Sequence, residues 1–215
     1  MTERFAIYYA PERGSALDRR ADAWLAQEDL LARTVSARRY GFHATIKAPM
    51  ALAPGFDRAA LEMGLANFAR TAAPVDLGRL AVTPIEGFLA LTATPQPQAL
   101  TDFATGVITA FEPLRAPLEP ADRARRLKAP LSDRQIALLD TYGYPYVLEQ
   151  FQFHMTLTDR LPEAEAGAMR ARAADWFAET LAAPVVLDRL VLFHEAEPGS
   201  AFRRLDDYRL EGGTR

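Results

Sequence analysis

Phe42-His43-Ala44-Thr45-Ile46 is repeated later in the chain as Phe153-His154-Met155-Thr156-Leu157. Each frame reads phenylalanine, histidine, an apolar residue, threonine and an aliphatic residue, and the histidines lie 111 positions apart. In a β-strand, residues i and i+2 lie on the same face. Each frame is therefore predicted to be a strand that presents an imidazole beside a hydroxyl on one face and apolar side chains on the other.

The polar face of each predicted strand continues beyond the histidine and threonine. Lys47 extends the first face, and Thr158 and Arg160 extend the second. The opposite faces are apolar and suit packing against helices, and a slip of one residue would bury the polar set. We therefore expect the histidines to line a groove. An imidazole is the side chain whose ordinary charge change falls near neutral pH, so two of them suit proton transfer.

A second repeat supports the first. Residues 73–82 match residues 183–192 at six of ten positions, with an offset of 110. Two independent matches at nearly one spacing indicate a duplicated plan, and the period is far too long for a solenoid. His194 has no counterpart at this offset, where the chain has Pro84, and we expect it to be structural or exposed.

Local patterns predict the same order of elements in each half. Besides the two histidine frames, the predicted strands cover residues 5–9, 75–82, 87–93, 185–193 and 202–210. The predicted helices cover residues 16–26, 57–71, 98–111, 132–141 and 163–181, from the spacing of their apolar residues. Asp57 and Ser132 are the expected N-caps of two of them. The segment 112–131, rich in proline and arginine, is the least defined.

Antiparallel sheets with helices on one side imply an α+β fold. We expect residues 1–215 to form a single bilobal domain with two pseudo-symmetric lobes, residues 1–95 and residues 96–215, each carrying one histidine frame. Each lobe would be an antiparallel sheet with helices on its outer face. The two sheets would face each other across a central groove.

The composition is that of an ordinary globular protein, with 49% hydrophobic and 25% charged residues. The absence of cysteine excludes disulfides, thiolate metal sites and cysteine nucleophiles. A net charge of −3 argues against a long nucleic-acid footprint. The start of the chain lacks the pattern of a signal peptide and no apolar run is long enough to span a membrane. We expect a cytoplasmic monomer that is not bound to a membrane.

Basic and aromatic residues offer further candidates for the groove. Arg39 belongs to a basic cluster just before the first frame, whereas the cluster at residues 123–128 is interpreted as solvated surface. Tyr9, Tyr40 and Tyr144 could stack on a ring of the substrate. Aromatic residues near Pro and Gly also pack loops, so both interpretations of Tyr40 and Tyr144 remain open. Tyr8 and Tyr9 share one strand, and one of them must point away from the helices.

Two histidine-x-threonine motifs on a duplicated α+β chain resemble the two-histidine (2H) phosphoesterase superfamily. Three segments are similar to the DUF1045 branch, which is associated with phosphonate metabolism: Arg38–Pro49, Tyr142–Tyr146 and Phe151–Thr158. The resemblance implies that His43 and His154 are the acid–base pair and that Thr45 and Thr156 bind the phosphate oxygens. It further implies chemistry without a metal or other cofactor.

Several alternatives remain open on the sequence. Two histidines without cysteine or carboxylate at ligand spacing make a poor zinc set. The leading hypothesis is hydrolysis of a small cyclic phosphodiester, for which the resemblance suggests 5-phosphoribosyl 1,2-cyclic phosphate. The second is cyclic phosphate opening or 2′-5′ ligation at an RNA end, and the third is a non-catalytic module that binds a phosphorylated metabolite. The near-symmetry of the frames leaves the acid and the base unassigned.

Overall fold

Seven strands form one antiparallel sheet in the computed structural model, which describes residues 3–213. Their order is β4-β5-β6-β2-β1-β8-β9, and a separate two-stranded sheet pairs β3 with β7. The strands are β1 (Arg4–Tyr9), β2 (Ala44–Met50), β3 (Val75–Asp76), β4 (Leu80–Ile85), β5 (Phe88–Ala93), β6 (Met155–Thr156), β7 (Val186–Leu187), β8 (Arg189–Glu195) and β9 (Arg203–Arg209).

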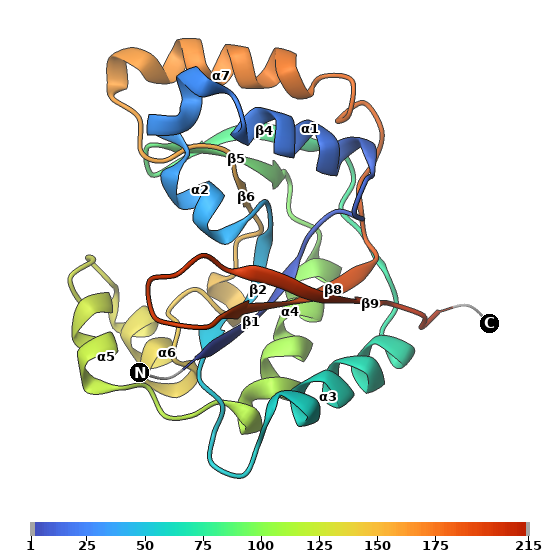
Figure 1. Ribbon diagram of the computed structural model, residues 1–215, viewed down its shortest axis with the longest axis vertical. Coiled ribbons are helices and arrows are strands. Elements are labelled where there is room, and N and C mark those ends of the chain that lie inside the picture. The colour runs from blue at the N-terminus through green and yellow to red at the C-terminus, as the bar shows by residue number, and fades with distance from the viewer. Residues whose placement is uncertain (1–2, 214–215) are drawn as a thin grey trace.

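Helices cover the sheet at both ends of the molecule, with α1 and α7 over β4 and β5 and with α3 and α4 at the opposite end (Figure 1). The α-helices are α1 (Ala16–Leu25), α2 (Val35–Tyr40), α3 (Arg58–Thr71), α4 (Gln98–Phe111), α5 (Pro120–Arg126), α6 (Asp133–Tyr142) and α7 (Glu163–Phe177). Short 3-10 turns are η1 (Glu28–Arg33), η2 (Glu112–Leu114) and η3 (Leu148–Gln150). Within residues 3–213, no helix combines the length and the apolarity needed to cross a membrane.

The predicted elements correspond closely to the observed ones. Asp57 caps α3 by accepting the Ala60 N–H, and Ser132 forms a capping box with Gln135 at the start of α6. The range 75–82 is divided into β3 and β4, because Gly78 adopts a left-handed φ of +65° that a continuous strand does not allow. Helix α2 and helix α5, the latter inside the undefined segment, were not predicted.

The α+β class is confirmed, but the strands are not divided between the halves of the chain. β6 pairs with β5 and β2, and β8 pairs with β1, so the sheet combines strands from both sides of residue 95. Helix α3 of the first half packs on β8 and β9, whereas α7 of the second half packs on β4. The expected lobes 1–95 and 96–215 therefore exchange elements. Local periodicity identifies strands and helices but does not specify which partner they pack against.

The two faces of the sheet have separate apolar clusters. On β1, Phe5, Ile7 and Tyr9 belong to the main core under the helices, while Ala6 and Tyr8 belong to a smaller cluster on the opposite face. Strand β8 alternates in the same way. The smaller cluster includes Phe193 and Phe202, with Tyr40 packed against it. Because the histidine frames also alternate, this second face is the one that carries the imidazoles.

Trp24 joins α1 to the second histidine frame, and its indole predicts a measurable stability effect. The ring is fully buried against Trp176 and Phe177, and its Nε1 donates to the Leu157 carbonyl at 2.9 Å. Trp24→Phe removes that donor and leaves a void, so we expect the free energy of unfolding in urea to fall by about 1–3 kcal/mol.

Met63→Ala is the control, because the Met63 side chain is 64% exposed and should change the free energy by less than about 0.5 kcal/mol. Equal stability of Trp24→Phe and the wild type would show that the indole hydrogen bond does not anchor the frame.

Candidate active site

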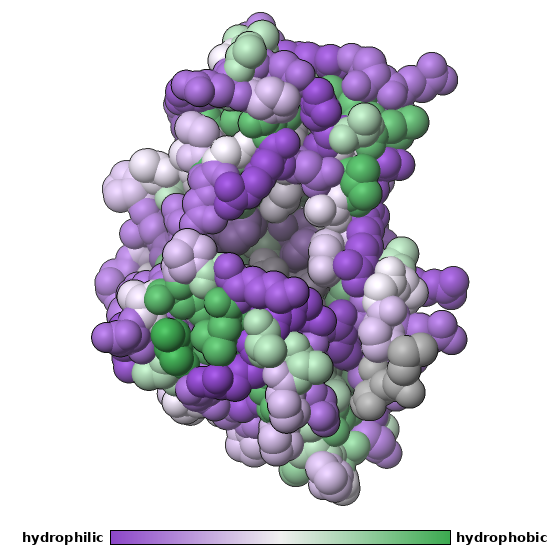
Figure 2. Space-filling view, turned by 90° about the vertical axis from the view of Figure 1, so that its left-hand side faces the viewer, coloured by the Kyte–Doolittle hydropathy of each residue, from purple (hydrophilic) through white to green (hydrophobic). Residues whose placement is uncertain are grey.

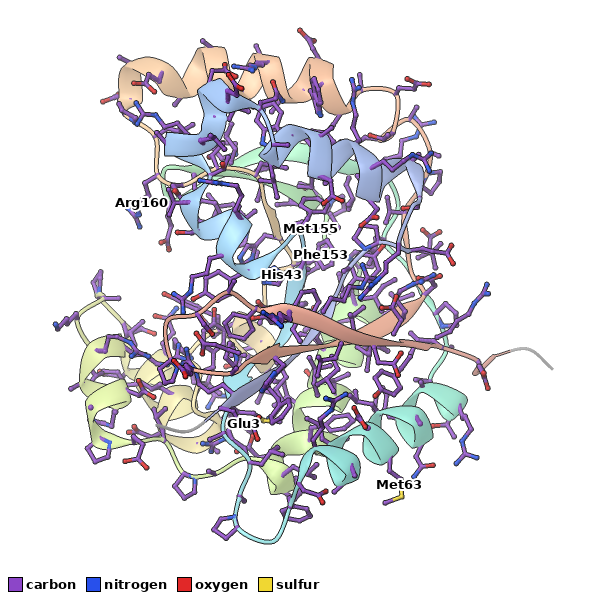
Figure 3. All side chains as sticks on the ribbon, in the orientation of Figure 1. Glu3, His43, Met63, Phe153, Met155 and Arg160 are labelled. Atoms are coloured by element: carbon purple, nitrogen blue, oxygen red, sulfur yellow. The ribbon has the colours of Figure 1, made fainter. Side chains whose placement is uncertain are left out.

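The two histidine frames lie side by side because β2 pairs with β6. The register is antiparallel and sets Ala44 opposite Met155, and both side chains are fully buried in the core. One residue either way along this register brings His43 opposite Thr156, and Thr45 opposite His154. Residues opposite each other on paired strands have Cβ atoms about 4.5–5.5 Å apart. Figure 3 shows His43 next to Phe153 and Met155 of the second frame.

Each imidazole is held in one tautomer by the same backbone contact. His43 Nδ1 donates to the Gly41 carbonyl at 2.8 Å, and His154 Nδ1 donates to the Gln152 carbonyl at 2.9 Å. A carbonyl accepts only, so each Nδ1 carries the proton and each neutral ring keeps Nε2 as an acceptor. The Thr45 hydroxyl donates to His43 Nε2 at 3.3 Å. Both frames therefore present a proton acceptor beside a threonine.

Gly41 is required for the first of these contacts. It ends α2 with a left-handed φ of +73°, a conformation that is strained for residues with a side chain. The turn brings its carbonyl back to His43, two residues later. The chain can therefore pass from helix to strand within three residues and still orient the ring.

Aromatic rings surround His43 and keep it neutral. Tyr8 stacks on the imidazole with ring centroids 3.9 Å apart, and Tyr40 and Phe193 lie at 6.0 and 6.1 Å. Burial lowers the pKa of His43 to about 4, and repulsion from His154 adds to this shift while the Gly41 carbonyl opposes it. His154 instead has the Phe88 ring beside it, at 5.9 Å. The symmetric frames thus have asymmetric surroundings.

The register brings the histidine and threonine of each frame together. The three residues that were predicted to extend the polar face, Lys47, Thr158 and Arg160, lie elsewhere. Lys47 is 2% exposed, and its Nζ donates to Glu112 at 2.8 Å, so the two residues form a largely buried ion pair. Thr158 is fully buried, and its hydroxyl accepts the Leu89 N–H. Arg160 projects to the edge of the molecule, 73% exposed and paired with Glu86 (Figure 3). The predictions that Lys47 and Thr158 bind phosphate were therefore wrong, whereas the role of Arg160 stays a prediction.

The strands explain this outcome. Strand β6 ends at Thr156, so the alternation that was extended to Thr158 and Arg160 no longer applies. Lys47 does lie two residues beyond Thr45 on β2. The bulge between Ile7 and Tyr8, however, sets Lys47 opposite Ile7 of the main core, and the Lys47 side chain reaches Glu112 at the end of α4.

Two of the four groove candidates gather near His43. Tyr40 contacts the imidazole directly, and the pKa of Tyr144 is raised by burial and by Tyr40 among its neighbours. Tyr9 is instead a core residue that donates to the Val186 carbonyl, so the prediction that it lines the groove was wrong. Arg39 forms an ion pair with the buried carboxylate of Glu195 at 2.6 Å, and its guanidinium lies over the Tyr40 ring.

Tyr8 lies against His43, and the sequence analysis did not select it as a groove residue. Strand β1 alternates, so only one of the adjacent tyrosines can face His43, and the pairing of Tyr8 with Thr45 across β1 and β2 selects it. The sequence indicated the choice between Tyr8 and Tyr9 but not its outcome, because a bulge between Ile7 and Tyr8 shifts the register.

A hollow opens at mid-height on the face of the molecule shown in Figure 2, between the part that contains α1 and α7 and the part that contains α5 and α6. Mostly hydrophilic residues surround it. Within residues 3–213, no cluster of three or more His, Cys, Asp or Glu side chains is arranged to hold a metal ion. The groups gathered around His43 are a second histidine frame, hydroxyls and aromatic rings.

Known proteins share parts of this sequence and fold. Two curated proteins named "Ribose 1,5-bisphosphate phosphokinase PhnN" are 35% identical, in Janthinobacterium sp. (strain Marseille), and 36% identical, in Laribacter hongkongensis (strain HLHK9). Each match covers 93% of this chain but 49% and 50% of the relative. The chain thus spans about half the length of these relatives.

TT0787 of Thermus thermophilus has a similar solved structure, with a TM-score of 0.52 over 98% of this chain and 99% of that chain. At 15% sequence identity this similarity shows a common fold. The sequence profile of the family described as "Protein of unknown function (DUF1045)" matches residues 45–203, which include Thr45 and the whole second histidine frame. The expected family is confirmed by this match, and the chain belongs to the DUF1045 family.

Proposed function

We propose that this protein is a phosphodiesterase that hydrolyses a small cyclic phosphodiester, with His43 and His154 as the acid–base pair. The observation that carries the proposal is the β2–β6 register, which sets the two histidine-threonine pairs beside each other. Both rings have Nδ1 fixed by a carbonyl, so both Nε2 atoms are available for proton transfer. Two proton-transfer groups and two hydroxyl donors around one position suit in-line displacement at phosphorus.

The environments of the rings support one assignment of the acid and base roles in the proposed hydrolysis. Neutral His43 accepts a proton from water through Nε2 as the water oxygen bonds to phosphorus. The bond between phosphorus and the ring oxygen breaks, and protonated His154 donates its Nε2 proton to the departing alkoxide. The product is a phosphomonoester beside a free hydroxyl. A positive charge on His154 disfavours protonation of His43, which keeps the two rings in the opposite states that the reaction needs.

Thr45 and Thr156 complete the site by donating to the non-bridging oxygens, where charge accumulates in the transition state. Threonine suits this position because its β-branched side chain has a restricted χ1 on a strand, so the hydroxyl oxygen is held in place while the O–H can rotate. Thr45 bonds to His43 in the free protein and would turn its hydroxyl to the phosphate when substrate binds.

The names of the relatives favour a phosphorylated ribose as the substrate class. Both relatives are named for a ribose bisphosphate kinase, and this chain corresponds to about half of each. A cyclic phosphate of ribose fits both this chemistry and the aromatic rings beside His43, on which a sugar ring can pack. We therefore propose ribose 1,2-cyclic phosphate bearing a 5-phosphate as the first compound to assay.

Replacing either histidine should strongly reduce turnover. We expect His43→Ala and His154→Ala each to lower kcat/KM by about 10²–10⁴-fold, because each removes one proton-transfer step. The assay is ring opening of ribose and nucleoside cyclic phosphates followed by phosphorus NMR, with EDTA present throughout.

His194→Ala is the matched control, because His194 pairs with Glu3 at 2.6 Å and stacks on Phe5, away from the two frames. Its activity should equal that of the wild type. Undiminished turnover by a folded His43→Ala or His154→Ala variant would contradict the assignment.

The pH dependence of kcat/KM should reflect the neutral state of His43. Protonation of this base stops the reaction, so the acidic limb should lie near pH 4, the pKa of His43. An ordinary histidine base would already lose activity below about pH 6.5. Tyr40→Ser admits water to the ring and should raise the pKa of His43, which moves the limb to higher pH. A wild-type limb at about pH 6 or above would be incompatible with a desolvated base.

Thr45→Val and Thr156→Val should each lower kcat by about 10²–10³-fold, because valine keeps the shape but cannot donate to the developing charge. Thr158→Val provides the comparison. It leaves the buried Leu89 N–H without its acceptor, so we expect about 1–3 kcal/mol of lost stability with little change in kcat. Urea unfolding and steady-state kinetics on the three variants separate the two effects, and equal kcat values for all three would refute the phosphate-binding role.

A further inference from the structure

Arg126 is held in an unusual state at the end of α5. Among residues 3–213, its Nε is the one buried side-chain nitrogen or oxygen that has no hydrogen-bond partner. Its guanidinium lies over the Tyr144 ring, with Cζ 5.0 Å from the centroid. Its neighbours on the same helix are satisfied, because Arg123 pairs with Asp140 at 2.6 Å and Arg125 pairs with Asp122 at 2.6 Å. The basic cluster at residues 123–128 was interpreted from sequence as solvated surface. It therefore contains one arginine, Arg126, with a buried nitrogen that has no hydrogen-bond partner.

A partly buried guanidinium without an anion is unfavourable. Burial lowers the pKa of Arg126 despite support from Tyr144 and Asp122, and Arg125 and Arg4 add repulsion. Buried polar groups are nearly always paired in folded proteins, so an unpaired donor calls for a ligand or water. The terminal nitrogens are not among the enclosed unpaired atoms, so an oxyanion can approach them from the solvent side.

The position of Arg126 connects it to the histidines. Tyr144 lies under the guanidinium, and burial raises its pKa with a further contribution from Tyr40. Burial also raises the pKa of Tyr8, with further contributions from Tyr40 and Tyr144. Tyr8 stacks on His43, and Tyr40 lies beside it. Arg126 therefore lies against a tyrosine that interacts electrostatically with the tyrosines beside His43. Arg4, whose charge also acts on Arg126, and Arg39 are both bound to Glu195 and are not free to bind a ligand.

We propose that Arg126 binds a phosphomonoester on the same substrate whose cyclic diester lies between His43 and His154. This inference rests on the proposed function and extends it to substrate selection. A phosphate dianion offers paired oxygens that match the fork of a guanidinium, which lysine cannot reproduce. Tyr144 holds the guanidinium plane from below. Burial also raises the pKa of the Tyr144 phenol, which therefore stays protonated and able to donate a hydrogen bond.

The test compares ribose 1,2-cyclic phosphate with its 5-phosphorylated form, using the ratio of their kcat/KM values. We expect the wild type to prefer the phosphorylated compound by about 10²-fold, mainly through KM. Arg126→Met should reduce this preference at least about tenfold, and Arg126→Lys should retain part of it. Arg125→Met is the matched control from the same helix and should keep the wild-type preference.

A merely structural role for Arg126 would slow both compounds equally, and an unchanged ratio in Arg126→Met would overturn the inference. A second measurement does not depend on turnover: calorimetric titration of each variant with ribose 5-phosphate and with ribose. We expect the wild type to bind ribose 5-phosphate at least about tenfold more tightly than Arg126→Met does. If neither cyclic compound is hydrolysed, the proposed function fails. Equal binding of ribose 5-phosphate by both proteins would show separately that Arg126 is not the anion site.

Discussion

The pairing of Ala44 with Met155 is the contact on which the site depends. Both side chains are buried, so the register cannot slip by one residue without exposing two apolar strands and burying two imidazoles. Sheet formation therefore positions the two histidine–threonine pairs, because burial of the apolar face leaves the imidazoles on the opposite face of the sheet. Trp24 supports the same arrangement from the core side through its bond to the Leu157 carbonyl.

The duplicated plan of the chain explains why two similar histidine frames occur. The exchange of helices between the two halves explains why the surroundings of the two histidines differ. Each half sends its long helix to the strands of the other half, α3 to β8 and β9 and α7 to β4, so neither half has a complete core of its own. The surroundings of the histidines are consequently built from different segments. His43 is enclosed by Tyr8, Tyr40 and Phe193, whereas His154 has Phe88 beside it. Equal motifs in unequal environments are what an acid–base pair requires, because the two groups must hold opposite protonation states.

Much of this structure was accessible from sequence, and the remainder was not for identifiable reasons. Period-two alternation in the frames predicted that His43 and Thr45 share a face, and the capping residues Asp57 and Ser132 located helix starts. Strand partners were not predictable, because periodicity carries no information on which strand pairs with which. Lys47 and Thr158 failed as phosphate ligands for a related reason: their distant partners, Glu112 and the Leu89 N–H, left no local signal. The isolation of Arg126 among paired arginines likewise emerges only when their three-dimensional partners are known.

The proposed convergence of two imidazoles on one anion is tested most directly by crystallography of the protein with phosphate or vanadate. The account predicts a single tetrahedral or bipyramidal anion within hydrogen-bond distance of His43 Nε2, His154 Nε2 and the Thr45 and Thr156 hydroxyls. Both Nδ1 atoms should keep their bonds to the Gly41 and Gln152 carbonyls. An anion bound by one histidine alone, or two anions bound separately at the two frames, would contradict it.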